Sequence, residues 1–309
     1  MQESRMSAEL LSVMGCCGKK LQGWYDRAVS KFSSRFPQPI RILSDLHLGS
    51  PQSKIDEIAT LAPLLEGART VIFNGDTREE RVPELRGRSE EAYHELVELC
   101  ESLGADPIFL CGNHDPQISE HHYLDLCEGR FFVTHGDMLF PMITPWSCEI
   151  DEIKTGVEEI HERYGKAAEN DLGLAVERLK EVRHQLPTHS PSVRGNSSLE
   201  RFIWSAFELW PPRRVFDILS IWRKTPHLAR EFLRMYRPSA ECVIIGHTHR
   251  CQVSTDQEPH FMNTGAFASG LGQCLGEIDQ DRLWSHRVGR RRKGGAWFLG
   301  GRRAIGSHS

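Results

Sequence analysis

The chain has 309 residues, of which 39% are hydrophobic and 26% are charged, a composition that is ordinary for one large globular domain. Its formal net charge of −4 argues against a protein whose main activity is nucleic-acid binding, so we expect no nucleic-acid partner. No run approaches the roughly 18 apolar residues that a membrane-spanning helix needs. The nine cysteines include no CxxC pair, which favours a reducing, cytoplasmic compartment without a disulfide framework.

Residues 1–38 form a polar leader whose pattern favours a helix ahead of two closely spaced prolines. The leader has no apolar segment followed by a small-residue cleavage site, so we expect no secretory signal peptide. We predict that the main folded domain extends from residue 39 to residue 285.

Five short apolar runs after the leader have the length and the β-branched or aromatic content of buried strands. These runs span residues 40–43, 70–73, 107–110, 131–133 and 242–245. Helical patterns lie between them, for example at 53–65 and 89–103. Alternating strands and helices predict an α/β fold in which helices cover central sheets. Asp, Asn or His side chains follow each run closely, and ligands in such folds bind beyond the carboxyl ends of the strands.

Between residues 141 and 238 the pattern is helical, without a strand. The predicted helices span residues 149–170, 171–185, 198–209, 213–224 and 227–236. Because this segment separates two strands that end in possible ligands, we interpret it as a helical cap inserted over the site. Its tryptophans Trp204, Trp210 and Trp222 lie near basic residues and indicate either a surface for a membrane or acyl chains, or ordinary helix packing. We favour packing, because the apolar residues around them recur at helical spacing.

The last segment, residues 286–309, carries seven basic residues and no acidic one. The rest of the chain carries 31 basic and 42 acidic residues, so a basic, Gly-rich tail follows an acidic body. This composition predicts a disordered tail. Contact of the tail with anionic lipid or with nucleic acid is the alternative.

Seven side chains near the ends of the predicted strands suit a site for two divalent cations. Asp45 and His47 are two residues apart, so both can point the same way from an extended strand end. Asp76 follows the next strand and suits a place between two cations, because a shared carboxylate offsets their repulsion. An amide oxygen and three imidazoles complete the set, from Asn113, His135, His247 and His249. Mixed oxygen and nitrogen donors suit Mn, Fe, Zn or Co rather than Ca.

These residues lie in five blocks whose order resembles the calcineurin-like metallophosphoesterase superfamily. The blocks are Asp45-x-His47, Gly75-Asp76, Gly112-Asn113-His114-Asp115, His135 and Gly246-His247-x-His249. Each block alone is a weak signal, but the ordered set is specific, and the resemblance covers most of the chain between the two termini. It implies a β-sandwich flanked by helices and a metal-dependent hydrolase of phosphoric ester or pyrophosphate bonds.

The resemblance also implies roles for the individual residues. One metal is held by Asp45, His47 and His249, the other by Asn113, His135 and His247, and Asp76 bridges the two. The implied cofactors are two divalent ions, with Mn²⁺ first and Fe, Zn or Co as alternatives, and a hydroxide between them attacks phosphorus. His114 donates to a phosphoryl or leaving-group oxygen, and Asp115 orients His114.

Within the superfamily, the chain is most similar to the UDP-2,3-diacylglucosamine diphosphatases of lipid A biosynthesis. The similar segments are 44–48, 134–137, 246–249 and 263–265, together with the helical insertion. There are two departures. His114 stands where that branch has Arg, and the sequence Thr77-Arg78-Glu79-Glu80 replaces the acidic and aromatic residues expected after Asp76. The departures concern the substrate rather than the chemistry.

Three functions are compatible with these residues. The first is a hydrolase of a pyrophosphate or phosphodiester bond in a nucleotide-sugar lipid, with peripheral membrane contact through the cap or the tail, and the tryptophans of the cap favour it. The second is a soluble phosphodiesterase or phosphatase that acts on nucleotides or phosphoproteins, and His114 favours it. The third, a non-catalytic scaffold, is the least favoured, because a scaffold has no need for a complete set of ligands.

Overall fold

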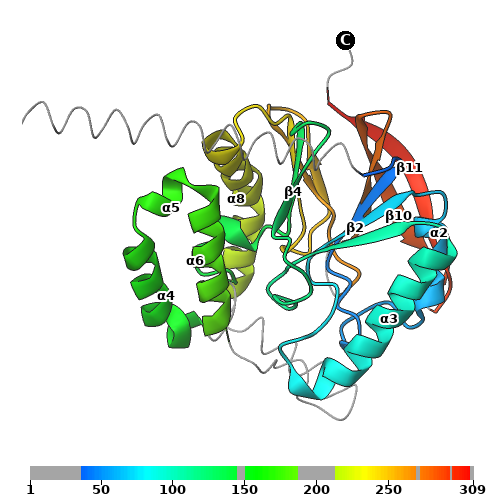
Figure 1. Ribbon diagram of the computed structural model, residues 1–309, viewed down its shortest axis with the longest axis horizontal. Coiled ribbons are helices and arrows are strands. Elements are labelled where there is room, and N and C mark those ends of the chain that lie inside the picture. Colours follow the sequence, from blue (N-terminus) through cyan, green and yellow to red (C-terminus); the bar gives the residue numbers. More distant parts are fainter. Residues whose placement is uncertain (1–35, 145–149, 187–212, 269–271, 293, 307–309) are drawn as a thin grey trace, which may run out of the picture.

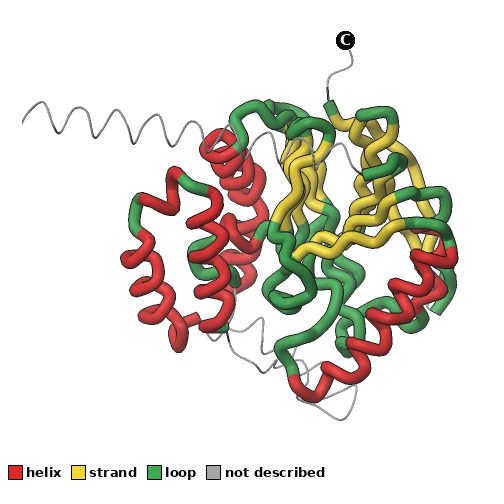
Figure 2. The backbone as a smooth tube through the Cα atoms, in the orientation of Figure 1, coloured by secondary structure: helices red, strands yellow, loops and turns green. Residues whose placement is uncertain are grey.

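The computed structural model describes residues 36–144, 150–186, 213–268, 272–292 and 294–306. Two β-sheets lie face to face, and helices cover the outer side of each (Figures 1 and 2). This arrangement confirms the predicted α/β fold, a β-sandwich flanked by helices. Residues 1–35 of the leader and the predicted helix at 198–209 lie outside the described residues, as do Trp204 and Trp210.

The first sheet has six strands in the order β11-β10-β9-β1-β2-β3. Their bounds are Ile40–Leu43 for β1, Thr70–Asn74 for β2, Asp106–Leu110 for β3, Cys274–Asp279 for β9, Arg282–Arg290 for β10 and Trp297–Ile305 for β11. Strands β1, β2 and β3 run parallel, so their carboxyl ends lie at one edge of the sheet. All three were predicted from their apolar runs.

The second sheet has five strands in the order β4-β5-β6-β8-β7. Their bounds are Tyr123–Leu126 for β4, Phe131–Thr134 for β5, Cys242–Ile245 for β6, Gln252–Ser254 for β7 and His260–Asn263 for β8. Strands β5, β6 and β8 run parallel. The runs predicted at 131–133 and 242–245 therefore lie side by side, although more than 100 residues of sequence separate them.

The space between the sheets is filled by alternate side chains of both. Ile42 and Ile72, which are register partners on β1 and β2, pack in one buried cluster with Val133 and Ile244 of the second sheet. The opposite face of β2 buries Val71 and Phe73 under helices. Each such side chain contributes about 1.5–3 kcal/mol by its burial. Because both faces of these strands are covered, they read as continuous apolar runs.

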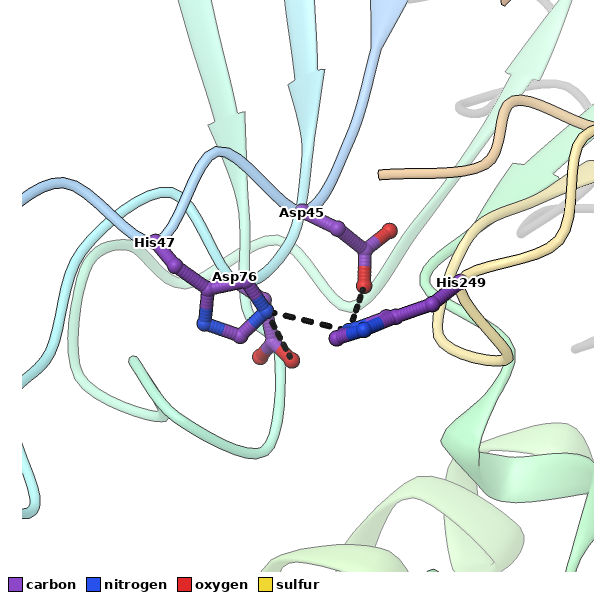
Figure 3. Close-up of side chains that lie close together, drawn as sticks. All are labelled: Asp45, His47, Asp76 and His249. Carbon is purple, nitrogen blue, oxygen red and sulfur yellow. Dashed lines mark hydrogen bonds and ion pairs between the residues drawn. The ribbon is translucent and has the colours of Figure 1, made fainter. Parts of the chain in front are cut away.

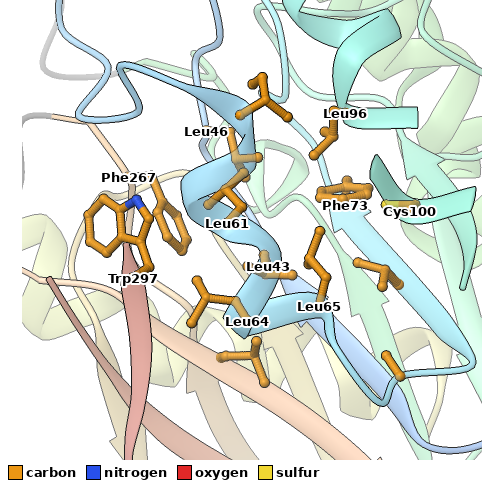
Figure 4. Packing of buried hydrophobic residues seen from close by; sticks show 14 of the residues in the cluster. Leu43, Leu46, Leu61, Leu64, Leu65, Phe73, Leu96, Cys100, Phe267 and Trp297 are labelled. Carbon is orange, nitrogen blue, oxygen red and sulfur yellow. The ribbon is translucent and has the colours of Figure 1, made fainter. Parts of the chain in front are cut away.

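Two helices cover the first sheet, namely α2 (Ala62–Leu65), which extends the 3-10 turn η1 (Ile58–Leu61), and the longer α3 (Arg86–Ser102). A second 3-10 turn, η2 (Pro83–Leu85), leads into α3. Figure 4 shows Leu61, Leu64, Leu65 and Leu96 of this layer in one buried cluster with Phe73. Trp297 of β11 stacks edge-on against Phe267, with ring centroids 5.0 Å apart, and closes the far end of the cluster.

The helices of the cap are α4 (Ile150–Tyr164), α5 (Ala167–Asn170), α6 (Leu172–Gln185) and α8 (Arg213–Tyr236), with the 3-10 turn η3 (Asp137–Leu139) between β5 and the cap. Helices α6 and α8 lie against the second sheet, and α4 packs on α6 (Figure 1). Val176 and Leu233 of this layer pack against Phe132 and Val243 of the sheet. In the described part of the segment 141–238 no strand occurs, as predicted. The two helices predicted around Pro226 are one continuous helix, in which the Thr225 hydroxyl donates to the Ile221 carbonyl.

The basic segment at 286–309 is not the disordered tail that its composition predicted. Most of it belongs to β10 and β11, which pair along their length at the edge of the first sheet. Val288, Trp297 and Ile305 are buried in the two clusters that line the sheet. The arginines occupy positions between these residues, so a count of charges obscured the alternation that marks a strand. Among the described residues, no helix is long and apolar enough to span a membrane.

Candidate metal centre

All seven predicted ligands lie on loops that follow strands and converge at one end of the sandwich. Asp45 and His47 follow β1, Asp76 follows β2, Asn113 follows β3, His135 follows β5, and His247 and His249 follow β6. Parallel strands in both sheets bring these carboxyl ends together.

The first cluster contains Asp45, His47, Asp76 and His249, whose ligand atoms lie within 4.8 Å of one another (Figure 3). The Nε2 atoms of His47 and His249 are 3.1 Å apart. His249 Nε2 is 3.3 Å from Asp45 Oδ1, and His47 Nε2 is 3.9 Å from Asp76 Oδ2. Two carboxylates and two imidazole nitrogens therefore face one small volume.

The second cluster contains Asp76, His135 and His247. His135 Nε2 is 3.3 Å from Asp76 Oδ2 and 3.2 Å from Asn113 Oδ1, which brings the amide oxygen of Asn113 into this cluster. Asp76 belongs to both clusters, which is the position that a bridging carboxylate needs.

The hydrogen bonds of the histidines show that these residues fit divalent cations. His135 Nδ1 donates to the carbonyl of Asn74 at 3.0 Å, so in the neutral ring the Nε2 lone pair points at two acceptor oxygens. Burial disfavours a charge there, but the Asp76 carboxylate outweighs it and raises the pKa of His135 to about 10. The negative charge of the Asp76 carboxylate also attracts a metal cation. His247 Nε2 donates to the carbonyl of Ile143 at 2.8 Å, which leaves Nδ1 as its ligand atom.

The backbone at the ligands is strained in a consistent way. Asp45, His47, Asp76, His247 and His249 have φ angles of 54°, 47°, 51°, 67° and 54°, in the left-handed region that such side chains rarely adopt. Each costs on the order of 1–2 kcal/mol, and such strain is concentrated at functional sites.

Two glycines let the loops approach one another. A Cβ at position 112 would lie 2.2 Å from Asp76 Oδ1 and 2.4 Å from the Asp76 nitrogen. A Cβ at Gly246 would lie 2.2 Å from Asp45 Oδ2 and 2.3 Å from Ser44 Oγ. Gly112 and Gly246 are therefore part of the site, because no side chain fits between the loops and the carboxylates.

His114 lies at the open edge of the site, with a third of its side chain exposed, and its main-chain nitrogen donates to Asp76 Oδ1 at 2.8 Å. Its Nδ1 lies 2.8 Å from Glu79 Oε2, while the other oxygen of Glu79 lies 2.9 Å from His47 Nδ1. One buried carboxylate thus holds both a predicted ligand and the predicted proton donor. Burial opposes a charge on His114, but Glu79 and Asp76 outweigh it and raise its pKa to about 9.

The contacts of the Asp115 carboxylate differ from the one expected with His114. The Asp115 carboxylate accepts hydrogen bonds from the main-chain nitrogens of Gly112, Asp76 and Thr77, at 2.8, 2.9 and 2.7 Å. It therefore ties the loop after β3 to the loop after β2. Glu79 contacts the imidazole of His114 instead. Glu79 was not predicted from the sequence, in which the segment 77–80 stands out only as a departure from a related branch. An acidic residue three positions after Asp76 was the signal available.

No curated protein sequence matches the chain. Solved structures to which the chain is similar include a single mutant of Vps29 from Entamoeba histolytica, at 12% identity and a TM-score of 0.42, covering 87% of this chain and 100% of that one. They also include a dimetal phosphatase from Danio rerio, at 11% identity and a TM-score of 0.42, covering 87% and 99%. A cold-active protein-tyrosine phosphatase from a Shewanella species has 12% identity and a TM-score of 0.39, with coverage of 87% and 80%.

The family comparison agrees with the site. The family model described as calcineurin-like phosphoesterase matches residues 38–251, more than half of the chain, and this range includes all seven clustered side chains and His114. The chain therefore belongs to the calcineurin-like phosphoesterase family and is a metal-dependent phosphoesterase.

Proposed function

We propose that the protein hydrolyses a phosphodiester or pyrophosphate bond at a centre of two divalent metal ions, with Mn²⁺ as the first choice. The observation that carries the proposal is the pair of ligand clusters that share Asp76, with His114 at their open edge. Two bound cations supply positive charge for the phosphoryl oxygens and lower the pKa of bound water.

The residues of the chain supply the remaining parts of the reaction. His114 keeps its Nδ1 on Glu79, so its Nε2 is the atom that delivers a proton to the leaving-group oxygen. Burial opposes a charge on His114, but Glu79 outweighs it and raises the pKa of His114 to about 9, which favours the protonated ring that an acid needs. Asp45 and Asp76 are buried, yet the neighbouring histidines keep the pKa of each carboxyl below its usual value.

For the substrate, we propose a nucleotide-linked lipid similar to UDP-2,3-diacylglucosamine. Three features support it, namely the similar sequence blocks, the helical cap, and the exposed apolar side chains of α8. Phe216 is 72% exposed and Leu219 is 45% exposed on this helix, an apolar surface that suits acyl chains or a membrane. The alternative is a soluble phosphodiesterase or phosphatase acting on nucleotides or phosphoproteins, which His114 favours because that lipid-cleaving branch has Arg at this position.

The test measures release of UMP from UDP-2,3-diacylglucosamine in the presence of Mn²⁺, beside an EDTA control and bis(p-nitrophenyl) phosphate. Metal-dependent release of UMP supports the lipid substrate. Cleavage of the aryl diester alone supports the second function and excludes the lipid. If neither compound is cleaved with Mn²⁺, Fe²⁺, Zn²⁺ or Co²⁺, the proposal of a phosphodiester or pyrophosphate hydrolase is wrong.

A further inference from the structure

We infer that Arg183 of the cap helix α6 is a positioning residue that fixes the geometry of the second ligand cluster, so that the cap is needed for metal loading. This inference rests on the two-metal centre proposed above. It assigns a role to a residue far from the ligands in sequence and outside every motif of the site.

Arg183 is buried, with 2% of its surface exposed, and its guanidinium uses several donors. Nε donates to Asp137 Oδ2 at 2.7 Å, and Nη2 donates to Asp137 Oδ1 at 3.0 Å. Nη2 also donates to the Cys111 carbonyl at 3.0 Å, and Nη1 lies 3.1 Å from His122 Nδ1. We call this group of contacts the Arg183 clamp.

The two chain segments joined by the clamp are those that carry the second cluster. Cys111 lies two residues before Asn113, and Asp137 lies two residues after His135. One rigid guanidinium therefore sets the relative position of the loops after β3 and β5, and the Asn113 oxygen and His135 Nε2 meet across this junction at 3.2 Å. The planar fork of Arg suits such a two-point contact, whereas Lys has a single charged nitrogen.

The same part of the cap contacts the other residues of the second cluster. Arg81, on the loop after Asp76, donates to the carbonyls of Arg183 and Leu186 at the end of α6. The carbonyl of Ile143, which accepts from His247 Nε2, belongs to a residue buried against Val182 and Leu186. Contacts from the cap thus reach the loops or the ring of every member of the second cluster.

A purely structural role is the competing explanation. A buried ion pair is weak evidence for stability, because apolar residues of similar volume often replace such a pair without loss. A directional ion pair instead fixes the geometry of the groups that it joins. When a partner that orients a metal ligand is lost, the metal affinity typically falls 10–100-fold. Metal affinity therefore separates a positioning residue from a structural one.

The experiment titrates metal-free protein with Mn²⁺ by calorimetry and compares the wild type with Arg183→Met, Arg183→Lys and the control Arg230→Met. Arg230 is also a buried arginine, at 5% exposure, but it donates to the Pro259 carbonyl and to Ser254. We expect the weaker of the two sites to lose affinity about 10–100-fold in Arg183→Met and less in Arg183→Lys. The control is expected to bind both ions as the wild type does.

In Arg183→Met the Asp137 carboxylate is left buried without its partner, and this charge can prevent folding. The double variant Asp137→Asn with Arg183→Met removes that charge and therefore covers this case. Circular dichroism of the metal-free proteins confirms that each variant is folded. If folded variants without Arg183 bind two Mn²⁺ ions with wild-type affinities, the inference is wrong and the metal centre stands. If the wild type itself does not bind two ions, the two-metal centre is wrong.

Discussion

A single buried carboxylate, Glu79, holds His47 and His114 through their Nδ1 atoms. Burial opposes its charge, but His114 and then His47 outweigh this effect and lower the pKa of Glu79 to about 2. Glu79 is therefore negative at neutral pH and fixes the tautomer of both rings, so that each presents Nε2 to the site. Its charge is also the main reason that the pKa of His114 is raised.

We predict that Glu79→Gln lowers kcat roughly tenfold to hundredfold, because the variant loses the charge that orients the ligand and keeps His114 protonated. His114 can donate a proton only below its pKa. Removal of the Glu79 charge lowers the pKa of His114, so the alkaline limb of the pH profile of kcat moves to lower pH. The control is Glu80→Gln, because the Glu80 carboxylate pairs with Arg78, whereas the Glu79 carboxylate contacts both histidine rings. An unchanged pH profile in Glu79→Gln contradicts this role.

Within the Arg183 clamp, the buried ring of His122 makes stability depend on pH. Burial first, and then the charges of Arg183 and Lys180, lower its pKa from 6.5 to about 4. The unfolded chain binds a proton here below about pH 6.5, but the folded protein does so only below about pH 4. The free energy of unfolding is therefore expected to fall by on the order of 2 kcal/mol as the pH drops from 6.5 to 4.

Urea unfolding with EDTA at pH 7.5 and pH 5 measures this dependence. The variant His122→Asn keeps an acceptor for Arg183 but does not titrate, so we expect its loss of stability between the two pH values to be smaller. An equal loss in both proteins contradicts the assignment to His122.

The ligand residues were predictable from sequence, whereas their supporting partners were not. Asp45, His135 and His249 each lie within four residues of the end of a buried run, and the ordered blocks select them from other polar residues. Arg183 carries no such local mark, and the only mark of Glu79 is its place three positions after Asp76, outside the ordered blocks. Their roles arise from loops and helices that meet only in the folded chain, at sequence separations of 35 residues for Glu79 with His114 and 46 for Arg183 with Asp137.

At the scale of elements, the loop after β6 shows how the backbone prepares the site. Gly246 lets this loop approach Asp45, and the His247 nitrogen then donates to the Asp45 carboxylate at 3.0 Å. Asn263 of β8 fixes the loop from the other side by donating to the Gly246 carbonyl at 2.8 Å.

We predict that Gly246→Ala abolishes tight metal binding and costs about 1–3 kcal/mol of stability, although no ligand is changed, because the new Cβ overlaps the Asp45 carboxylate. Gly87→Ala is the matched control. Gly87 lies in α3, where nothing lies within 4 Å of an added Cβ, so its replacement is expected to stabilise the protein by about 0.5–1 kcal/mol. Metal calorimetry and thermal unfolding measure both effects, and normal metal binding by Gly246→Ala contradicts the account.

The strands β1, β2, β3, β5 and β6 were predictable because each contains a short run of apolar residues, whereas the buried strands β4, β8 and β9 mix apolar and polar residues and were not predicted. The strands β10 and β11 were missed because their few buried apolar residues are interspersed with polar and basic ones, such as Arg302 and Arg303 of the edge strand β11. The break predicted at Pro226 did not occur, since this proline lies in the interior of α8, where tertiary packing outweighs helix propensity.

At the scale of the whole molecule, the C-terminal strands complete both cores. Leu283, Val288, Trp297 and Ile305 are buried, and each contributes about 1.5–3 kcal/mol, so their sum is comparable to the total stability of an ordinary domain. We predict that deletion of residues 282–309 abolishes cooperative thermal unfolding. Calorimetry compares this protein with the full chain. A stable, active protein after this deletion is the result expected of a disordered tail and contradicts the structure.

The central claim is that this chain is a phosphoesterase whose two ligand clusters share Asp76, and its most direct test combines metal content with turnover. Metal-free protein is titrated with Mn²⁺ while the hydrolysis of bis(p-nitrophenyl) phosphate is followed, for the wild type and for Asp76→Asn. We predict no turnover with EDTA, activity that rises up to two equivalents of Mn²⁺, and at least a hundredfold loss in a folded Asp76→Asn protein with weakened metal binding. Full turnover by Asp76→Asn with added Mn²⁺, or by the wild type in EDTA, would contradict the claim.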